Sequence, residues 1–226
     1  MKRSLRDVRP ATIIAMLIVA VAAWLFLELA VEMLEGETRK FDERVLLAFR
    51  SAGGTSDPLG ATWVEELARD VTGLGSVAVL AFLTLTSAGF LLLQRKWQLA
   101  IYLVCAVATG VIGSTLLKWG FDRPRPDLVA HGHAVYTSSF PSGHSMMSAV
   151  VFLTLGVLLA TTQTKPVMQI YILSIAVLGT VAVGISRVYL GVHWPTDVLA
   201  GWLAGTGWAL LCWIIADLLR DRGQIE

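Results

Sequence analysis

Charged residues are scarce in this sequence. Only 15% of its 226 residues are Asp, Glu, Lys or Arg, whereas about 25% is usual in a soluble globular domain. The formal net charge is +1, and no Lys/Arg run is long enough to form a basic patch. We therefore expect neither a soluble globule nor a nucleic-acid-binding protein. The two cysteines, Cys105 and Cys212, both lie in apolar stretches. We interpret them as small packing residues that do not indicate a redox compartment.

Hydrophobic residues make up 55% of the chain, and they gather into six long stretches. Each stretch contains at least 18 residues and few charges, so a helix formed from it could cross a hydrocarbon layer of ~30 Å. The stretches cover residues 11–34, 71–93, 99–117, 145–162, 167–185 and 198–216. The sequence therefore predicts an all-α integral membrane bundle of six transmembrane helices, forming a single domain over residues 1–226.

The N-terminal region is similar to a signal peptide, because four cations precede its apolar run. That run is longer than a signal core, and no small-x-small cleavage site follows it, so we predict an uncleaved first span. The segments outside the spans differ in their density of Lys and Arg. On the side of the two termini these segments contain nine Lys and Arg in 29 residues, and on the other side they contain nine in 75 residues. The positive-inside rule therefore predicts cytoplasmic termini.

The connection between the first two spans, residues 35–70, contains two apolar patterns with helical spacing. They are Phe41, Val45 and Phe49, and Leu59, Trp63 and Leu67. Asp57-Pro58 is typical of an N-cap followed by a first-turn proline. We predict two short helices on the membrane surface. A loop folded over the bundle fits the pattern equally well.

Polar and ionisable residues lie at the ends of four predicted spans. Because successive spans cross the membrane in opposite directions, these four ends lie on the same membrane surface. Lys118 closes the third span, Ser142 and His144 open the fourth, Arg187 closes the fifth, and His193 and Asp197 open the sixth. Polar residues at the ends of membrane spans are expected either to have hydrogen-bond or ionic partners or to take part in function. This surface is therefore the candidate functional site.

The chemistry of this surface suits a phosphate group. Ser142 is a plausible N-cap, so the amides of Gly143 and His144 would point out of a helix N-terminus, which favours anions. Three cations would match the charge of a dianion, and the arginines could bind its oxygens in pairs. These cations are Lys118, Arg125 and Arg187.

His193 and Asp197 are four residues apart, and Pro195 between them marks the first turn of the sixth span. At this spacing the carboxylate can orient the imidazole, so that the other ring nitrogen presents its lone pair. His144 would then protonate the leaving oxygen as a general acid. The pattern indicates nucleophilic phosphoryl chemistry.

Three motifs in this region resemble the signatures of the type-2 phosphatidic acid phosphatase superfamily. They are Lys118-x6-Arg125-Pro126, Pro141-Ser142-Gly143-His144 and Ser186-Arg187-x5-His193-x3-Asp197. The resemblance covers residues 118–197 only. The sequence Arg123-Pro124-Arg125-Pro126 is a doubled Arg-Pro pair, and spacing alone selects Arg125 over Arg123 as the motif residue.

The resemblance implies a membrane phosphatase that needs no metal or other cofactor. By this likeness His193 attacks phosphorus, Asp197 orients it and His144 protonates the leaving group. The phosphoryl oxygens would be held by Lys118, Arg125, Arg187, Ser142 and Gly143. It also implies a bacterial inner membrane location with the site on the outer, periplasmic face. The expected substrate is a lipid phosphate: undecaprenyl diphosphate, phosphatidylglycerol phosphate, phosphatidic acid or lipid A 1-phosphate.

Other interpretations remain open for these residues. Taken singly, each histidine could cap a helix, and each cation could extend to lipid headgroups. A transporter could use the cationic cluster to hold a phosphorylated lipid without cleaving it. A family member could also act on a small soluble phosphate ester.

Five further residues have an unresolved role. His131 and His133, with Asp127, are a weak pattern for a metal site, and we favour a mobile loop at the rim of the site. Glu28 and Glu32, near the end of the first span, are expected to meet headgroups, water or another helix. The sequence does not indicate an oligomeric state.

Overall fold

The computed structural model describes residues 10–51, 54, 57–128 and 138–221, and these residues form eight α-helices and no β-strand. The helices are α1 Pro10–Glu35, α2 Arg39–Ala48, α3 Thr62–Gly73, α4 Val77–Leu93, α5 Trp97–Gly120, α6 Gly143–Ala160, α7 Pro166–Tyr189 and α8 Pro195–Asp221. In this described part, five helices are long and apolar enough to cross a membrane. The bent pair of α3 and α4 can supply a sixth span. The prediction of an all-α membrane bundle is confirmed.

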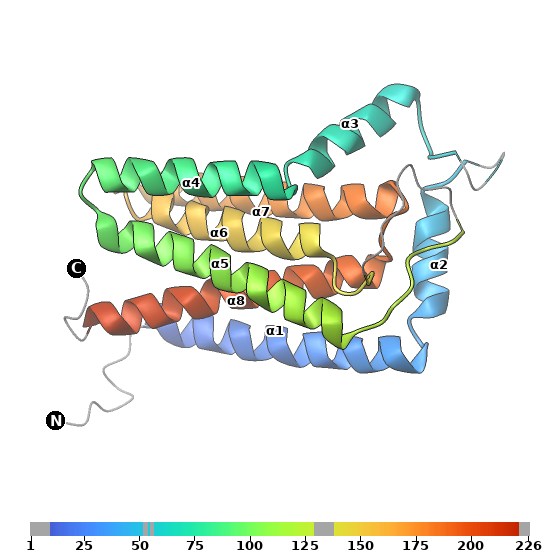
Figure 1. Ribbon diagram of the computed structural model, residues 1–226, viewed down its shortest axis with the longest axis horizontal. Coiled ribbons are helices and arrows are strands. Elements are labelled where there is room, and N and C mark those ends of the chain that lie inside the picture. The colour runs from blue at the N-terminus through green and yellow to red at the C-terminus, as the bar shows by residue number, and fades with distance from the viewer. Residues whose placement is uncertain (1–9, 52–53, 55–56, 129–137, 222–226) are drawn as a thin grey trace.

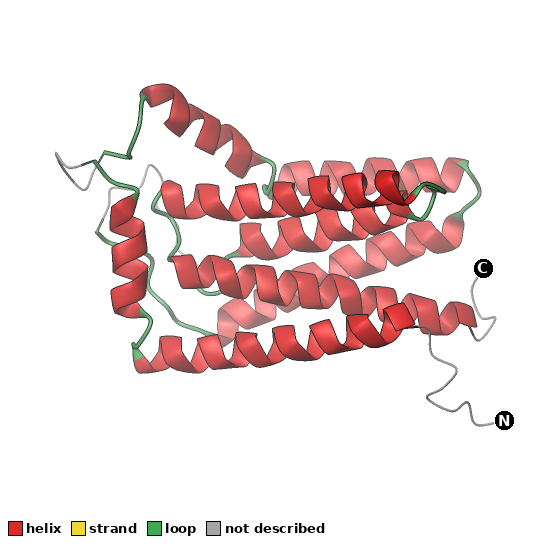
Figure 2. Ribbon diagram, turned by 180° about the vertical axis from the view of Figure 1, so that it is seen from behind, coloured by secondary structure: helices red, strands yellow, loops and turns green. Residues whose placement is uncertain are grey.

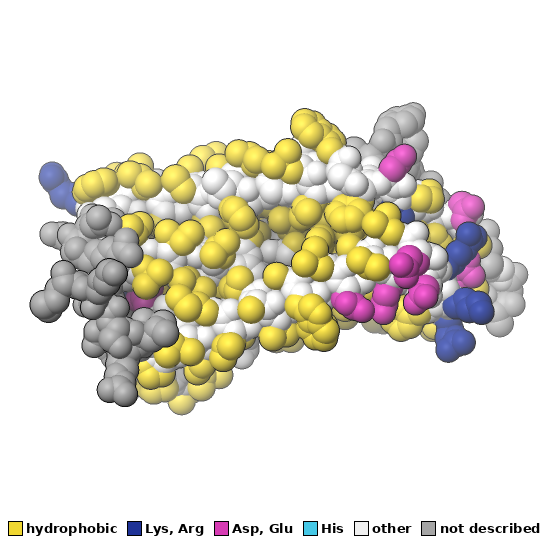
Figure 3. Space-filling model, turned by 90° about the horizontal axis from the view of Figure 1, so that it is seen from below, with side chains coloured by type: hydrophobic (Ala, Val, Ile, Leu, Met, Phe, Trp, Pro, Cys, Tyr) yellow, Lys and Arg dark blue, Asp and Glu magenta, His cyan; other side chains and the backbone are white. Residues whose placement is uncertain are grey.

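The long helices run side by side, and α1 begins at the same end of the bundle where α8 ends (Figure 1). Helix α6 lies at the centre, packed on both α7 and α8, and α1 packs on α8. The reverse view shows α2 lying across the opposite end of the bundle (Figure 2). Hydrophobic side chains cover the flank seen in Figure 3, and charged side chains gather toward its ends. This distribution is the one expected for a protein surrounded by lipid.

Two glycines of α8 allow α6 and α8 to approach closely. A Cβ added at Gly201 would lie 2.7 Å from the carbonyl oxygen of Ser142, and one at Gly205 would clash with the carbonyl oxygen of Met146. Any larger residue here would therefore force the helices apart. The close approach joins the N-terminal ends of α6 and α8, where the histidines lie.

The second predicted span, residues 71–93, is not one continuous helix. Helix α3 ends at Gly73, and α4 begins at Val77 with Ser76 as its N-cap, at an angle of 46° to α3. Gly75 lies in the break, and a Cβ there would be 2.5 Å from Val183 Cγ1. Apolar composition could not reveal this bend, because the residues on both sides of it suit a helix. The other five spans agree with the prediction to within five residues at each end.

Helix α2 confirms the first predicted short helix. Its buried residues are Asp42 and Leu46, whereas Phe41 is half exposed. Val45 and Phe49 of the predicted stripe are partly buried against the same core cluster as Leu46, so the inward face includes them and Asp42 beside them. The apolar pattern did not point to Asp42, because a buried aspartate is rare unless it is paired.

Helix α3 is the second predicted short helix, and its apolar stripe faces away from the bundle. Trp63 and Leu67 are both more than half exposed. The helix begins at Thr62 after Ala61, which makes no side-chain cap. The prediction that Asp57-Pro58 starts this helix is therefore wrong. Pro58 instead pairs with Arg50 in an isolated β-bridge, so this part of the chain is held extended.

Candidate active site

The His193 and Asp197 side chains meet at the start of α8, at the end of the bundle covered by α2. His193 Nδ1 lies 3.4 Å from Asp197 Oδ2, and both side chains are almost completely buried. The same carboxylate oxygen accepts hydrogen bonds from the backbone N–H of Trp194, at 2.9 Å, and from the hydroxyl of Ser139. Asp197 is therefore held in one orientation beneath the imidazole.

Arg125 contacts the other nitrogen of the same ring. Its Nη1 lies 3.3 Å from His193 Nε2, and it also donates to the carbonyl oxygen of Val192 at 2.8 Å. A guanidinium can only donate, so Nε2 must be the acceptor and carry the lone pair. The proton then lies on Nδ1, which faces Asp197. This is the tautomer that a nucleophilic Nε2 requires.

The N-terminus of α6 lies against the same pair. The backbone N–H of Ser142 donates to the carbonyl oxygen of Asp197 at 2.9 Å, which ties the starts of α6 and α8 together. Ser142 is fully buried, and its hydroxyl oxygen caps α6 by accepting from the Ser145 N–H. The predicted N-cap is therefore present. Gly143 follows it, and a Cβ there would lie 3.3 Å from Lys118 Cε. The glycine thus leaves room for Lys118 beside the helix end.

Lys118 and Arg187 enter this region from the ends of α5 and α7. Lys118 Nζ donates to the carbonyl oxygen of Ser138 at 2.9 Å. Arg187 Nη1 donates to Thr72 Oγ1 at 3.1 Å, while its Nε is buried and has no hydrogen-bond partner among the residues that the structure describes. A buried N–H of this kind is costly unless a ligand satisfies it. Arg187 therefore offers a donor to a bound anion.

His144 lies next to these cations and next to the break between α3 and α4. It is within electrostatic reach of Arg187, His193 and Lys118. A Cβ at Gly75 would lie 3.4 Å from His144 Cβ. The break therefore contributes a wall of the site. The sequence analysis did not predict this contribution, because it placed these residues within a continuous span.

Burial sets the charge state of His193. The pKa of its imidazole is lowered to about 4, first by desolvation and then by the charges of Arg187 and Arg125, whereas Asp197 raises it. Desolvation also lowers the pKa of Arg125, which nevertheless stays cationic because an arginine begins so high. The site therefore combines a neutral imidazole with neighbouring cations near neutral pH.

Three residues near the His193–Asp197 pair were missed by the sequence analysis. The Ser139 hydroxyl bonds Asp197 and lies 3.4 Å from His193 Nδ1. Arg123 binds the second oxygen of Asp197, and Asp42 of α2 binds Arg123. The doubled Arg-Pro pair was a signal for Arg123, but nothing in the sequence pattern pointed to Asp42.

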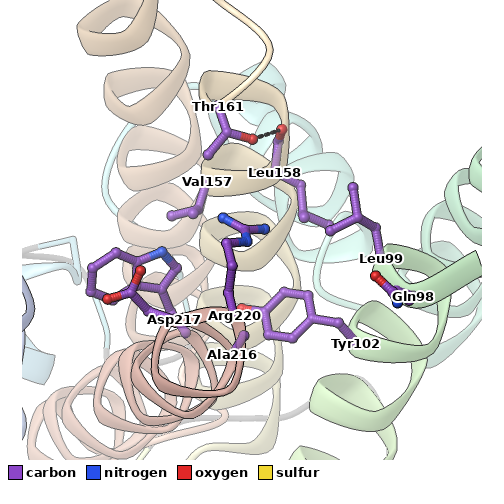
Figure 4. A pocket seen from close by; sticks show the side chains of 10 residues that line it. Gln98, Leu99, Tyr102, Val157, Leu158, Thr161, Ala216, Asp217 and Arg220 are labelled. Carbon is purple, nitrogen blue, oxygen red and sulfur yellow. Dashed lines mark hydrogen bonds between the residues drawn. The ribbon is translucent and has the colours of Figure 1, made fainter. Parts of the chain in front are cut away.

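Five further residues were left with an open role by the sequence. His131 and His133 fall outside the described residues, and Asp127 is exposed. Glu28 is exposed on α1, and Glu32 is half-buried. A small cavity of about 80 Å³ lies between α5, α6 and α8, with Tyr102, Asp217 and Arg220 in its lining (Figure 4). Neither of the described histidines, His144 and His193, lines this cavity.

The fold and this site together define a multi-pass helical membrane protein with a cationic, histidine-containing pocket at one end of its bundle. Comparison with protein-family models matches residues 98–221 to the PAP2 superfamily. The chain belongs to this superfamily.

Individual relatives support this membership. The chain is 33% identical over 147 residues to phosphatidylglycerophosphatase B of Bacillus subtilis (strain 168), covering 63% of this chain and 70% of that protein. It is 30% identical over 188 residues to a lipid A 1-phosphatase of Rhizobium etli, covering 72% and 75%. The crystal structure of a transmembrane PAP2 type phosphatidylglycerolphosphate phosphatase from Bacillus subtilis matches with a TM-score of 0.78 at 28% identity. That match covers 89% of this chain and 96% of the other.

Proposed function

We propose that this protein removes a phosphate or diphosphate headgroup from a membrane lipid, without a metal, through a phosphohistidine intermediate. The observation that carries the proposal is the orientation of His193, whose Nδ1 faces Asp197 and whose Nε2 faces Arg125. A protein that only binds phosphate needs cations but no carboxylate-oriented imidazole. The names of the relatives, which are lipid phosphatases, support the same reaction class.

In the first step, the lone pair of His193 Nε2 attacks phosphorus and an N–P bond forms. The bond between phosphorus and the lipid oxygen breaks, and His144, which is protonated in the complex with the anionic substrate, gives that oxygen its proton. Asp197 stabilises the charge that develops on the His193 ring. Lys118, Arg125 and Arg187, with the amides at the start of α6, neutralise the equatorial phosphoryl oxygens.

In the second step, water replaces His193 on phosphorus. His144, now neutral, accepts a proton from the attacking water, the N–P bond breaks, and inorganic phosphate leaves. Both histidines return to their starting state. The three cations supply the positive charge that a metal ion supplies in other phosphatases.

The substrate class follows from the position of the site. The pocket lies at an end of the membrane-spanning helices, so a headgroup could enter it while an apolar tail stays in lipid. We propose phosphatidylglycerol phosphate, undecaprenyl diphosphate, phosphatidic acid and lipid A 1-phosphate as substrates to compare. We also propose the inner membrane of a bacterium, with the site on its outer face and both termini cytoplasmic.

The test is phosphate release by the purified protein in detergent with excess chelator. We expect turnover on at least one lipid of the panel, and we expect His193→Ala to reduce it to the background rate. Arg69→Gln is a matched control, because Arg69 is exposed and pairs only with Glu65 on its own helix among the contacts described.

Four outcomes would contradict parts of this proposal. Unchanged turnover in His193→Ala would reject the nucleophile. Activity lost in chelator and restored by zinc or magnesium would reject the metal-independent mechanism. Binding of the lipids without any phosphate release would favour a transporter, and equal turnover of short-chain esters would favour a soluble substrate.

A further inference from the structure

Arg123 bridges two buried carboxylates on the far side of Asp197 from His193. Its Nη1 donates to Asp197 Oδ1 at 2.5 Å, and its Nη2 donates to Asp42 Oδ2 at 2.6 Å. Only 10% of the arginine side chain is exposed, and both carboxylates are fully buried. The planar guanidinium suits this task, because its two Nη atoms can serve two acceptors at once.

Asp42 is itself fixed to the start of α8. Its Oδ1 accepts from the backbone N–H of Thr196 at 2.9 Å, and its Oδ2 accepts from the Thr196 hydroxyl at 2.7 Å. Arg123 also donates to Thr196 Oγ1 at 2.8 Å. Thr196 lies directly before Asp197 in the chain. Helix α2 is therefore attached to the turn that carries the catalytic carboxylate.

The two arginines of the doubled Arg-Pro pair contact opposite ends of the His193–Asp197 pair. Arg125 reaches His193 Nε2, whereas Arg123 reaches Asp197 Oδ1. With Arg123 on Oδ1, the other oxygen, Oδ2, remains for the His193 ring, the Trp194 N–H and Ser139. The guanidinium also lies over the Trp194 ring, 5.7 Å from its centroid. Several contacts thus prevent Arg123 from turning toward a substrate.

We propose that Arg123, held by Asp42 of α2, is a positioning residue that fixes the Asp197 carboxylate so that Oδ2 stays on the His193 ring. The inference rests on the proposed function, since it concerns the orientation of its nucleophile. Asp42 lies outside residues 98–221, which the family match covers. Part of the catalytic geometry is therefore determined by a helix outside that region.

The alternative is that Arg123 binds substrate directly. Arg123 and Arg125 both line a cavity of about 300 Å³ that also contacts α2, so a headgroup could enter there. The two roles differ in kinetics. Loss of a positioning residue slows the chemical step and therefore lowers kcat. Loss of a residue that binds the substrate and the transition state equally well raises KM and leaves kcat unchanged.

The experiment compares Arg123→Gln, Arg123→Lys and the double variant Asp42→Asn/Arg123→Gln with the wild type, by kcat, KM and thermal unfolding. We expect Arg123→Gln to lower kcat by about 100-fold, because a small displacement of a reacting group has an effect of this size. KM should change less than threefold. Arg123→Lys should keep part of the kcat, since one ammonium can reach only one of the two carboxylates.

The double variant separates the effect of Arg123 on the position of Asp197 from its effect on stability as the cation between two buried carboxylates. Removing Arg123 alone leaves two buried carboxylates without their cation, which destabilises a protein. Asp42→Asn removes one of these charges, so we expect the unfolding temperature to recover while kcat stays low. The double variant also keeps the test valid if Arg123→Gln fails to fold.

Three results would overturn the inference: a wild-type kcat in the double variant, an unchanged kcat in folded Arg123→Gln, or a raised KM with unchanged kcat. The proposed function is tested separately by the wild type and His193→Ala. If the wild type releases no phosphate from any lipid, the proposed function fails. If it releases phosphate and the Arg123 variants match it, only this inference fails.

Discussion

At the scale of single residues, the site depends on opposing influences on His193. Burial disfavours the charged imidazolium, whereas the Asp197 carboxylate favours it. Burial has the larger effect, so the pKa of His193 is lowered to about 4. A nucleophile must present its lone pair before substrate arrives, and this balance keeps the ring neutral until the pH is strongly acidic.

The pH dependence of kcat/KM tests this balance. In the proposed mechanism neutral His193 is the active form, so falling pH should remove activity as the pH passes through about 4. An unperturbed histidine would lose activity near pH 6.5. Phosphate release measured in steps from pH 3.5 to pH 8 with one lipid substrate would locate this acidic limb. A limb centred near pH 6.5 would contradict the lowered pKa.

The same shift links folding to pH. Between pH 6.5 and about 4 the unfolded chain takes up a proton on His193 that the folded protein does not. The contribution of His193 to the free energy of unfolding should therefore be fully present above pH 6.5 and decrease as the pH falls toward 4. Thermal unfolding of wild type and His193→Gln should show a larger loss in the wild type over this interval. Equal losses in both proteins would argue against the linkage.

At the scale of elements, the contact between α6 and α8 sets the distance between the two histidine-bearing helix ends. Gly201 and Gly205 bring the α8 backbone against that of α6, and the Ser142 N–H bonds the carbonyl of Asp197. Helix α2 covers the same ends and supplies Asp42. The site is thus formed by several helix ends rather than within one helix.

Gly205→Ala tests the close contact. The added Cβ would clash with the carbonyl oxygen of Met146 and lie 2.7 Å from Ala149 Cβ. We expect a loss of about 1 to 3 kcal/mol in unfolding free energy, as is typical of overpacking. Unfolding in detergent, followed by tryptophan fluorescence, would measure it.

Gly207→Ala is the matched control in the same helix. Its Cβ would lie 3.7 Å from Ala22 Cβ, which is an ordinary contact. Alanine favours a helix interior over glycine by about 0.5 to 1 kcal/mol, so this variant should be as stable as the wild type or more so. If both variants were destabilised equally, the close contact between Gly205 and the α6 backbone would not be the cause of the lost stability.

At the scale of the whole molecule, charge and apolar surface define how the bundle lies in a membrane. The flank is hydrophobic, and α2 with the site lies at the end opposite the start of α1 (Figures 1 and 3). The higher density of Lys and Arg on the side of the termini predicts that this side is cytoplasmic. The site would then face outward.

Reporter fusions test this orientation in a bacterial host. A green fluorescent protein fused to the C-terminus should fluoresce, and an alkaline phosphatase fused there should be inactive, because the latter folds only outside the cytoplasm. Fusions truncated after Gly60 should give the reverse pattern. Active alkaline phosphatase at the C-terminus would overturn the predicted orientation.

The sequence alone determined that the chain is an all-α membrane bundle, and it identified the group of residues worth examining. Span length and apolar composition are local properties, and each span must satisfy its own backbone hydrogen bonds in lipid. Alternation of spans then brings Lys118, His144, Arg187 and His193 to one end without further information. For this reason the fold class was predictable from composition and spacing.

Only the tertiary structure decided how the residues around Asp197 share their contacts. Spacing could select Arg125 from the doubled Arg-Pro pair, but it could not show that Arg123 binds the opposite side of the Asp197 carboxylate. A second acidic partner of Arg123 is Asp42, 81 residues earlier, and the apolar pattern of its helix gave no sign of a buried carboxylate there. The break at Gly75 was also hidden in an apolar run. Such features depend on which backbones and charges meet across the bundle, and local sequence does not encode these distances.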